Sequence, residues 1–270
     1  MKIYDKKLAY PYFVWMVLFT VVPLFIVVYY AMTDAEGNFT LNNLTSISGY
    51  GSVFARSLLL ALIATVICLV IAFPVGYFLS RLRVNKQHIM LMLVMLPMWM
   101  NFLLRTLAWQ TLLEKTGVIN SILSTLHLPA LNIINTPSAI VLGMVYNFLP
   151  FMVLPLYNVL VKIDKSVINA AYDLGANGVQ TFVRIIFPLS LPGMFSGITM
   201  VFVPALTTFV ISKILGGSKI LLIGNVIEQE FKQGSNWHTG SGLSLVLMIF
   251  IIASMALIAK YDKNGEGTAF

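Results

Sequence analysis

Six long apolar blocks dominate this sequence and constrain its fold more than any other feature. They lie at about residues 10–33, 58–80, 89–109, 139–160, 191–211 and 243–259. Each block has about the 20 residues that an α-helix needs to cross about 30 Å of hydrocarbon. A single large soluble core would need helices with polar faces, which these blocks lack. The sequence therefore predicts an all-α membrane protein with six transmembrane helices, built as one transmembrane domain over residues 1–270.

Composition agrees with this prediction. The chain is 59% hydrophobic and only 10% charged, whereas soluble domains carry about 25% charged residues. The first apolar block is too long and too aromatic for a cleaved signal peptide, and no small-residue cleavage site follows it. We therefore expect it to remain as a membrane span.

The basic residues predict the orientation of the spans. With the N-terminus inside, the cytoplasmic segments hold eleven Lys and Arg, the outer segments hold five, and Arg105 lies within the third span. This bias follows the positive-inside rule. Both termini are thus expected in the cytoplasm. The net charge of +7 is the charge of inner loops that face anionic membrane lipids, and it requires no nucleic acid.

The spans carry no sign of catalysis. All ten Asp and Glu residues fall in loops or tails, which excludes an intramembrane aspartyl protease and argues against a proton relay of carboxylates. Ser241 has only His238 nearby as a base, so a serine hydrolase is a weak alternative. Cys68 is the only cysteine, which rules out a cysteine metal site, and we predict no metal ligands. No phosphate-binding motif is present, so any ATP would be bound by another chain.

Two outer segments have helical features of their own. Residues 118–126 have apolar side chains at helical spacing and predict a short amphipathic helix at the membrane interface. Residues 216–240 contain the apolar piece ILLIGNVI, which is too short to cross the membrane. This piece is either a re-entrant helix or a helix that lies on the surface.

Arg105 is the one charged residue within a span, and two explanations are open. It can reach outward to the lipid headgroups. Alternatively, it faces the bundle interior together with Asn101, one turn earlier, and lines a path or contacts a partner.

The cytoplasmic segment from about residue 161 to residue 190 is long and patterned. Its residues predict two short helices, the first capped by Ser166 and ended by Gly175 in a left-handed turn. We expect Pro188 to break or bend the chain before the fifth span. Such a compact helical knob is suited to docking.

This segment resembles the EAA loop in the membrane subunits of bacterial ATP-binding-cassette importers. The loop pattern is E-A-A, three residues, G, nine residues, then I-x-L-P. The sequence has Asn169, Ala170 and Ala171, then Gly175, then Ile185 to Pro188. Asn169 replaces the glutamate and Phe187 replaces the leucine. The coupling residues that the resemblance implies are Asn169, Ala170, Ala171, Asp173, Gly175, Ile185 and Pro188.

The wider sequence is similar to PotB-type permeases of spermidine/putrescine importers. The resemblance rests on segments such as MWMNFLLRTLAWQ, MVYNFLPFMVLPLYN and LIGNVIEQEF. It implies a multi-pass protein of the bacterial cytoplasmic membrane. The implied partners are a second permease subunit (PotC-like), two ATPase subunits (PotA-like) and an extracytoplasmic polyamine-binding protein (PotD-like). ATP and Mg²⁺ would be bound by the ATPase, and no cofactor by this chain.

A polyamine passing through such a permease could be held by aromatic faces and side-chain carbonyls. The candidate path residues are Trp99, Asn101, Arg105, Tyr146, Asn147 and Tyr157. Glu228 and Glu230 lie on the outer side, where they could meet the cation or its binding protein. Helix packing is an equally open explanation for each of these residues. The same architecture with another solute, or a passive channel or scaffold, remains an alternative.

Overall fold

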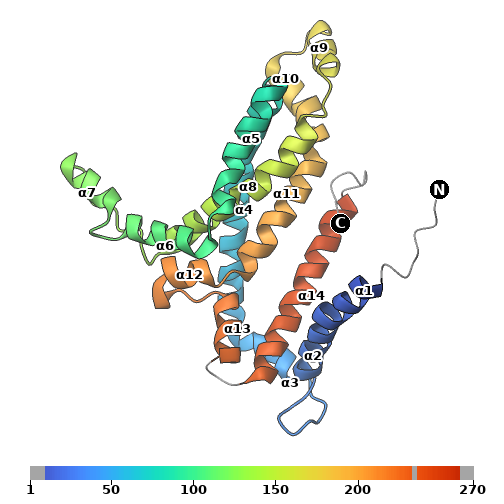
Figure 1. Cartoon of the computed structure of the whole chain (residues 1–270), viewed down its shortest axis with the longest axis vertical. Coiled ribbons are helices and arrows are strands. Elements are labelled where there is room, and N and C mark those ends of the chain that lie inside the picture. The colour runs from blue at the N-terminus through green and yellow to red at the C-terminus, as the bar shows by residue number, and fades with distance from the viewer. Residues whose placement is uncertain (1–9, 233–235, 262–270) are drawn as a thin grey trace. The chain divides into compact units, whose positions relative to one another are not determined.

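The computed structural model describes residues 10–232 and 236–261, and this part of the chain is almost entirely helical (Figure 1). Thr33 and Phe39 form an isolated bridge. The principal helices are α1 (Tyr10–Met16), α2 (Val22–Ala31), α3 (Asn42–Thr45), α4 (Gly51–Arg81), α5 (Val84–Trp99), α6 (Phe102–Leu113), α7 (Val118–Thr125), α8 (Pro137–Leu160), α9 (Lys165–Asp173), α10 (Gly178–Thr181), α11 (Phe187–Thr207), α12 (Val210–Leu215), α13 (Ile223–Lys232) and α14 (Trp237–Tyr261).

The described residues contain five helices long and apolar enough to cross a membrane, and up to six if one bent pair counts as a span. The five are Tyr10–Ala31, Asn42–Arg81, Pro137–Leu160, Gly178–Thr207 and Trp237–Lys260. This number of spans confirms the predicted all-α membrane class. Packing divides the chain into two compact units. One unit is Met1–Ser52 with Val226–Ile252, and the other, called unit 2 below, is Val53–Asn225 with Ala253–Phe270.

The third predicted span is wrong in its second half. The helix ends at Trp99 and restarts at Phe102, and the two segments meet at an angle of 86°. Met100 and Asn101 are extended, and the Asn101 side chain accepts hydrogen bonds from the backbone N–H groups of Leu103 and Leu104 at 2.8 and 3.3 Å. An asparagine N-cap starts a new helix, which is why the apolar block does not run straight through.

The fifth span also differs from its prediction. Pro188 does not break the chain, because the helix runs without interruption from Gly178 to Thr207. Residues Phe182–Ile186 form a π-helical turn, in which the N–H of Phe187 bonds to the carbonyl of Phe182. This wider turn lies directly before Pro188, which has no N–H to donate. The span therefore begins well before residue 191, and its helix ends at Thr207.

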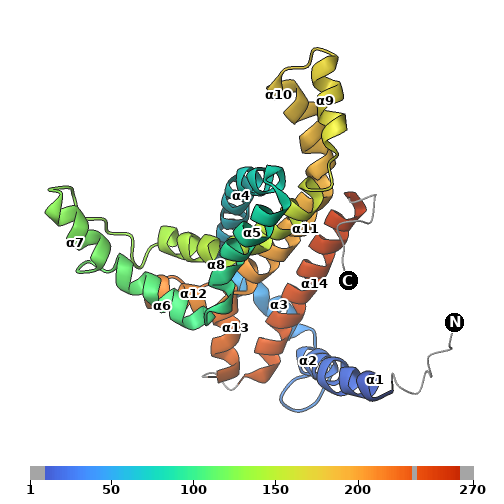
Figure 2. The same ribbon diagram turned by 45° about the horizontal axis from the view of Figure 1, so that its top comes forward.

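Unit 2 is built around the contact between α8 and α11. Glycines on α11 allow the two helices to approach closely. A Cβ on Gly193 would lie 2.8 Å from the carbonyl oxygen of Pro155, and one on Gly197 would lie 2.5 Å from Met152 Sδ. Small residues at such contacts are typical of membrane helices. In Figures 1 and 2, α4, α5, α8 and α11 lie side by side, and α9 and α10 lie together at one end of this unit.

A buried polar cluster fixes the segment that follows α11. Asn225 Oδ1 accepts hydrogen bonds from Ser212 Oγ and from the N–H of Leu222 at 2.5 and 3.1 Å. Its Nδ2 donates to the carbonyl of Phe209 at 2.9 Å. The next backbone group, the N–H of Ile223, donates to Ser57 Oγ on α4 at 2.8 Å. These bonds satisfy backbone groups where water is excluded.

The cluster also bears on the two alternatives for residues 216–240. This segment contains a helix, α13, that starts at Ile223, and Leu222 and Ile223 are fully buried. Burial of these residues is what a re-entrant helix requires. Whether α13 enters the membrane stays a prediction.

We expect Asn225→Ala to lower the free energy of unfolding by about 2–3 kcal/mol, because it leaves buried donors and an acceptor without partners. The measurement is unfolding of the detergent-solubilised chain by increasing SDS, followed by circular dichroism. Asn132→Ala is the matched control, because Asn132 is exposed. Equal stability of the two variants would contradict the structural importance of the cluster.

Candidate coupling surface and transport path

The first helix of the knob, α9, is capped by Asp164 and not by Ser166 as predicted. Asp164 Oδ1 accepts a hydrogen bond from the N–H of Ser166 at 2.9 Å. Sequence reasoning missed this cap, although an Asp before a helical run is a strong signal for one. The bond holds the pKa of Asp164 below its ordinary value. The cap therefore stabilises α9 fully at neutral pH, and this stabilisation is lost only as the pH falls through the lowered pKa of Asp164.

Gly175 ends α9 as predicted. It is left-handed, with φ of +85°. The N–H of Gly175 bonds to the carbonyl of Tyr172 at 2.9 Å, and the N–H of Ala176 bonds to the carbonyl of Ala171 at 3.0 Å. This pair of bonds is the Schellman arrangement, which requires a residue that tolerates positive φ.

The second knob helix starts with a capping box. Asn177 Oδ1 accepts the N–H of Gln180 at 2.8 Å, and Gln180 Oε1 accepts the N–H of Asn177 at 2.9 Å. Because each end of the turn is closed by specific hydrogen bonds, the knob has a defined shape.

The knob brings the residues of the EAA-like pattern to one end of unit 2. Asn169, Ala170, Asp173 and Gly175 are exposed, whereas Ala171 is buried. Ile185 is partly buried and Pro188 is exposed, and both lie on the helix that continues into α11.

Sequence reasoning did not single out the apolar tip of the knob. Leu174 is 89% exposed and Val179 is 73% exposed. Large apolar side chains this exposed on a polar loop are typical of a protein contact. Their position directly before and shortly after Gly175 was the signal that could have identified them.

A phenylalanine cluster joins the knob to α4. The ring of Phe73 on α4 lies 5.3 Å from that of Phe182 and 6.3 Å from that of Phe187. Phe182 is in the π-helical turn, and Phe187 is the first residue of α11. Displacement of the knob would therefore act on both α4 and α11.

The predicted path residues are not gathered in one place. Trp99 is 77% exposed, and Asn101 is used as the cap of α6. Tyr157 is buried, and its hydroxyl donates to Gln87 Oε1 at 3.4 Å. Tyr146 and Tyr157 are eleven residues apart on one helix, which is about 16 Å along its axis.

Two predicted path residues are buried and incompletely paired. Arg105 is 7% exposed, and its Nε and Nη1 atoms have no partner within the described residues. Burial favours an arginine that faces the protein interior over one that reaches the headgroups. Asn147 Nδ2 donates to the carbonyl of Gly143 at 2.9 Å, while its Oδ1 has no partner in the described part of the chain.

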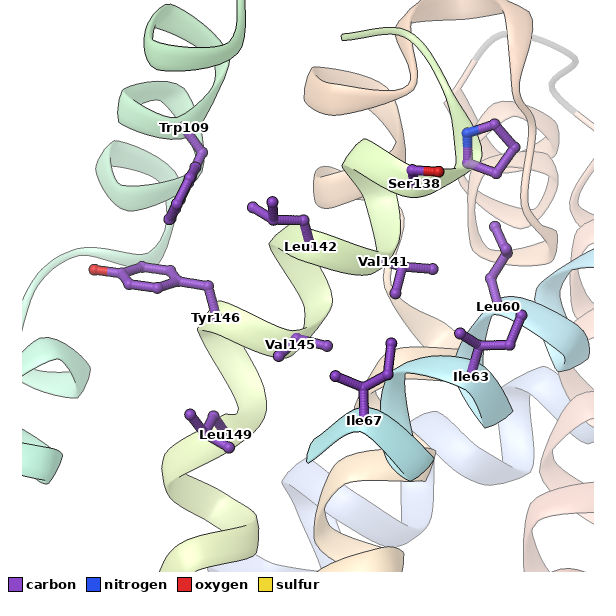
Figure 3. Close-up of a pocket in the computed structure, with 11 residues that line it drawn as sticks. Leu60, Ile63, Ile67, Trp109, Ser138, Val141, Leu142, Val145, Tyr146 and Leu149 are labelled. Atoms are coloured by element: carbon purple, nitrogen blue, oxygen red, sulfur yellow. The ribbon is translucent and has the colours of Figure 1, made fainter. Parts of the chain in front are cut away.

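Tyr146 lines a hollow of about 630 Å³ between α4, α6 and α8, shown in Figure 3. Its ring packs edge-on against Trp109, with 5.3 Å between ring centres. The lining is Leu60, Ile63, Ile67, Trp109, Pro137, Ser138, Val141, Leu142, Val145, Tyr146 and Leu149. None of these side chains is a carboxylate, so the hollow offers ammonium groups little beyond aromatic faces.

Glu228 and Glu230, which are predicted to lie on the outer side, both have partners. Glu228 Oε1 lies 2.8 Å from Lys232 Nζ in an exposed ion pair. Glu230 Oε1 accepts a hydrogen bond from the Tyr50 hydroxyl at 3.1 Å. His238, the only base close to Ser241 in the sequence, has its Nδ1 3.1 Å from the carbonyl oxygen of Tyr30. The described residues contain no group of three or more potential metal ligands.

The helical spans and the knob that continues into one of them define a class, the permease subunit of an ABC importer. The fold is similar to that of a crystal structure titled as a bacterial ABC transporter involved in the import of the acidic polysaccharide alginate. The TM-score is 0.81 at 13% identity, over 97% of this chain and 95% of that one. A second crystal structure is titled as a bacterial alginate ABC transporter in complex with an alginate pentasaccharide-bound periplasmic protein. It gives a TM-score of 0.73 at 13% identity, over 96% of this chain and 95% of that one.

Residues 72–261 match the family model described as "Binding-protein-dependent transport system inner membrane component", and the chain belongs to this family. It is 37% identical to the spermidine/putrescine transport system permease protein PotB of Haemophilus influenzae, over 93% of this chain and 91% of that protein. It is 39% identical to PotB of Escherichia coli K12, over 90% and 92%. These matches confirm the predicted resemblance. The chain is a membrane transport subunit and not an enzyme.

Gly175→Ala is expected to reduce coupled transport, because an L-residue in the left-handed conformation costs about 1–2 kcal/mol. Gly178→Ala is the matched control. Both glycines face open space, and only Gly175 has a positive φ. Gly175→Trp should uncouple transport more strongly, because the indole would occupy the predicted docking surface. The measurement is substrate uptake per ATP hydrolysed in the reconstituted complex. Normal coupling in Gly175→Trp would contradict the docking assignment.

Proposed function

We propose that this chain is a permease subunit of an ATP-driven importer of spermidine and putrescine. Its relatives with that printed function cover about 90% of the chain at 37–39% identity. The observation that supports coupling is the unbroken helix from Gly178 to Thr207, which joins the knob to a span. In this proposal the complex contains a second, PotC-like permease, two PotA-like ATPases and a PotD-like binding protein, and both termini lie in the cytoplasm.

The knob docks on one ATPase subunit in the proposed mechanism. Leu174 and Val179 enter an apolar cleft of that subunit, and Asn169 provides polar contacts in place of the glutamate. Closure of the ATPase pair on ATP and Mg²⁺ then moves the knob. Because α10, the π-helical turn and α11 are one helix, the movement reaches the membrane as a rigid-body rotation.

The Phe73 cluster extends this movement to a second span. Phe182 and Phe187 move with the knob, and their ring contacts carry α4 along with α11. ATP thereby shifts the equilibrium between the inward-facing and outward-facing states. The size of the shift is set by how much better the ATPase binds the knob in one state than in the other.

The substrate path forms between the two permeases in this proposal. The apolar blocks of this chain contain no Asp or Glu, so it does not offer a deep charged site for ammonium groups. Weak contacts with aromatic rings, each worth about 0.5–2 kcal/mol, suit a path from which the cargo must leave again. The binding protein supplies the affinity.

The direct test is uptake of radiolabelled spermidine into proteoliposomes that hold the complete complex with its binding protein. We expect uptake only with hydrolysable ATP on the ATPase side, and competition by unlabelled putrescine but not by amino acids. If a different binding protein stimulates ATP hydrolysis and no spermidine is taken up, the chain belongs to an importer of another solute. Uptake without ATP would contradict the importer and support a channel.

Leu174→Asp should weaken docking, because it places a charge in an apolar contact. We expect uptake and substrate-stimulated ATP hydrolysis to fall together while the chain still inserts into membranes. Val84→Asp is the control, because Val84 is also an exposed apolar residue, 64% exposed, at the start of α5 and outside the knob. Loss of activity in the control alone would contradict the assignment of Leu174 to the docking surface.

A further inference from the structure

Helices α4 and α11, which meet beside the knob, meet again at their other ends. Near the knob, the ring of Phe73 on α4 packs against the ring of Phe187 on α11. At the other end of α4, Ser57 lies about 24 Å from Phe73 along the helix axis. Thr207, where α11 ends, lies about 30 Å from Phe187 by the same measure. Both of these far ends reach the buried polar cluster around Asn225.

The cluster joins α4 to the first turn of α13. Ser57 Oγ accepts a hydrogen bond from the N–H of Ile223 at 2.8 Å and donates to the carbonyl of Val53 at 2.8 Å. Ser57 and Ile223 are both fully buried. Because no water competes for a bond in such a place, breaking it would leave a buried N–H without a partner. The first turn of α13 therefore follows this part of α4.

The end of α11 is joined to the same turn of α13. The helix stops at Thr207, and Thr208 is extended. A Cβ on Gly224 would lie 2.6 Å from the carbonyl oxygen of Thr207 and 3.1 Å from that of Thr208, so the two backbones are in direct contact. Asn225 Nδ2 also donates to the carbonyl of Phe209 at 2.9 Å. The first turn of α13 is therefore held both by α4 and by the end of α11.

Helix α13 continues from unit 2 into the other compact unit. Its first turn belongs to unit 2, and its residues from Val226 to Lys232 belong to the other unit. Because α13 is one continuous helix of 10 residues, a displacement of its first turn moves the rest of the helix. That remainder carries Glu228 and Glu230, which are predicted to lie on the outer side.

We propose that Ser57 and Asn225 are positioning residues that pass the ATP-driven movement of α4 and α11 on to α13. Through them, α13 changes its position when the ATPase pair closes on the opposite side of the membrane. This inference rests on the proposed function, in which the knob moves α4 and α11, and it adds where that movement ends. The competing explanation is a cluster that only stabilises the fold.

Chemical labelling of a cysteine on α13 tests this proposal in the complete complex. Gln229 is exposed on α13, whereas Cys68 is fully buried, so Gln229→Cys supplies the reactive thiol of this chain. The substrate-loaded binding protein is present throughout. A membrane-impermeant maleimide is added either without nucleotide or with the ATPase pair trapped by ATP and vanadate, and mass spectrometry measures labelling of this chain. We expect the labelling rate of Gln229→Cys to differ between the two states.

Ser57→Ala removes the acceptor of the Ile223 N–H and should abolish this difference, and spermidine uptake per ATP hydrolysed should fall with it. Ser80→Ala is the matched control, because Ser80 is also buried on α4 and its hydroxyl donates to the carbonyl of Tyr77 on the same helix. It should retain the difference. A cluster that only stabilises the fold would lower the amount of assembled complex and leave the difference unchanged in the complexes that form. A difference that persists in Ser57→Ala would therefore overturn the inference.

The measurement on Gln229→Cys alone remains decisive if Ser57→Ala does not assemble, because equal labelling in the two states would overturn the inference. Val179→Cys on the knob tests the proposed function separately, and we expect the ATPase subunits to protect it from a membrane-permeant maleimide. If Val179→Cys is protected while Gln229→Cys labels equally in both states, docking stands and the inference is wrong. If Val179→Cys is not protected while Ser57→Ala abolishes a difference at Gln229→Cys, docking through the knob tip is wrong and the inference stands.

Discussion

Hydrocarbon supplies no hydrogen bonds to a polypeptide backbone, and the rest of this structure depends on that constraint. A proline within a helix leaves a backbone carbonyl without its hydrogen-bond donor, because proline lacks an N–H. The chain meets this difficulty twice in the same way. A π-helical turn precedes Pro23, where the N–H of Val22 bonds to the carbonyl of Val17, and another precedes Pro188. In both places the helix continues through the proline.

Because the helix is continuous at Pro188, the knob is connected directly to a membrane span. If the chain had broken there, the knob would be a tethered loop, and its displacement would be absorbed by the linker. Instead, capping bonds fix the turn around Gly175, and the second knob helix is also the beginning of α11. Contacts of Phe73 then involve α4 in the same movement. In the proposed function, these features carry a local contact at the knob into a displacement of spans.

The tip of the knob is explained best by contact with another protein. Leu174 is almost fully exposed on a polar loop, and Val179 close by is also exposed. Such exposure is unfavourable in an isolated chain and becomes favourable when a partner covers the side chains.

The sequence by itself determined the helical class, the approximate positions of most spans and the knob with Gly175 at its turn. Apolar block length and the conformational demand of a left-handed residue are local properties, which a sequence displays directly. Only the tertiary structure decided the break at Asn101, the continuity through Pro188, the burial of Arg105 and the hydrogen bonds of Asn225 in the buried polar cluster. Each of these depends on which backbone groups and helices meet in space. The same residue types could have produced the opposite result with other neighbours.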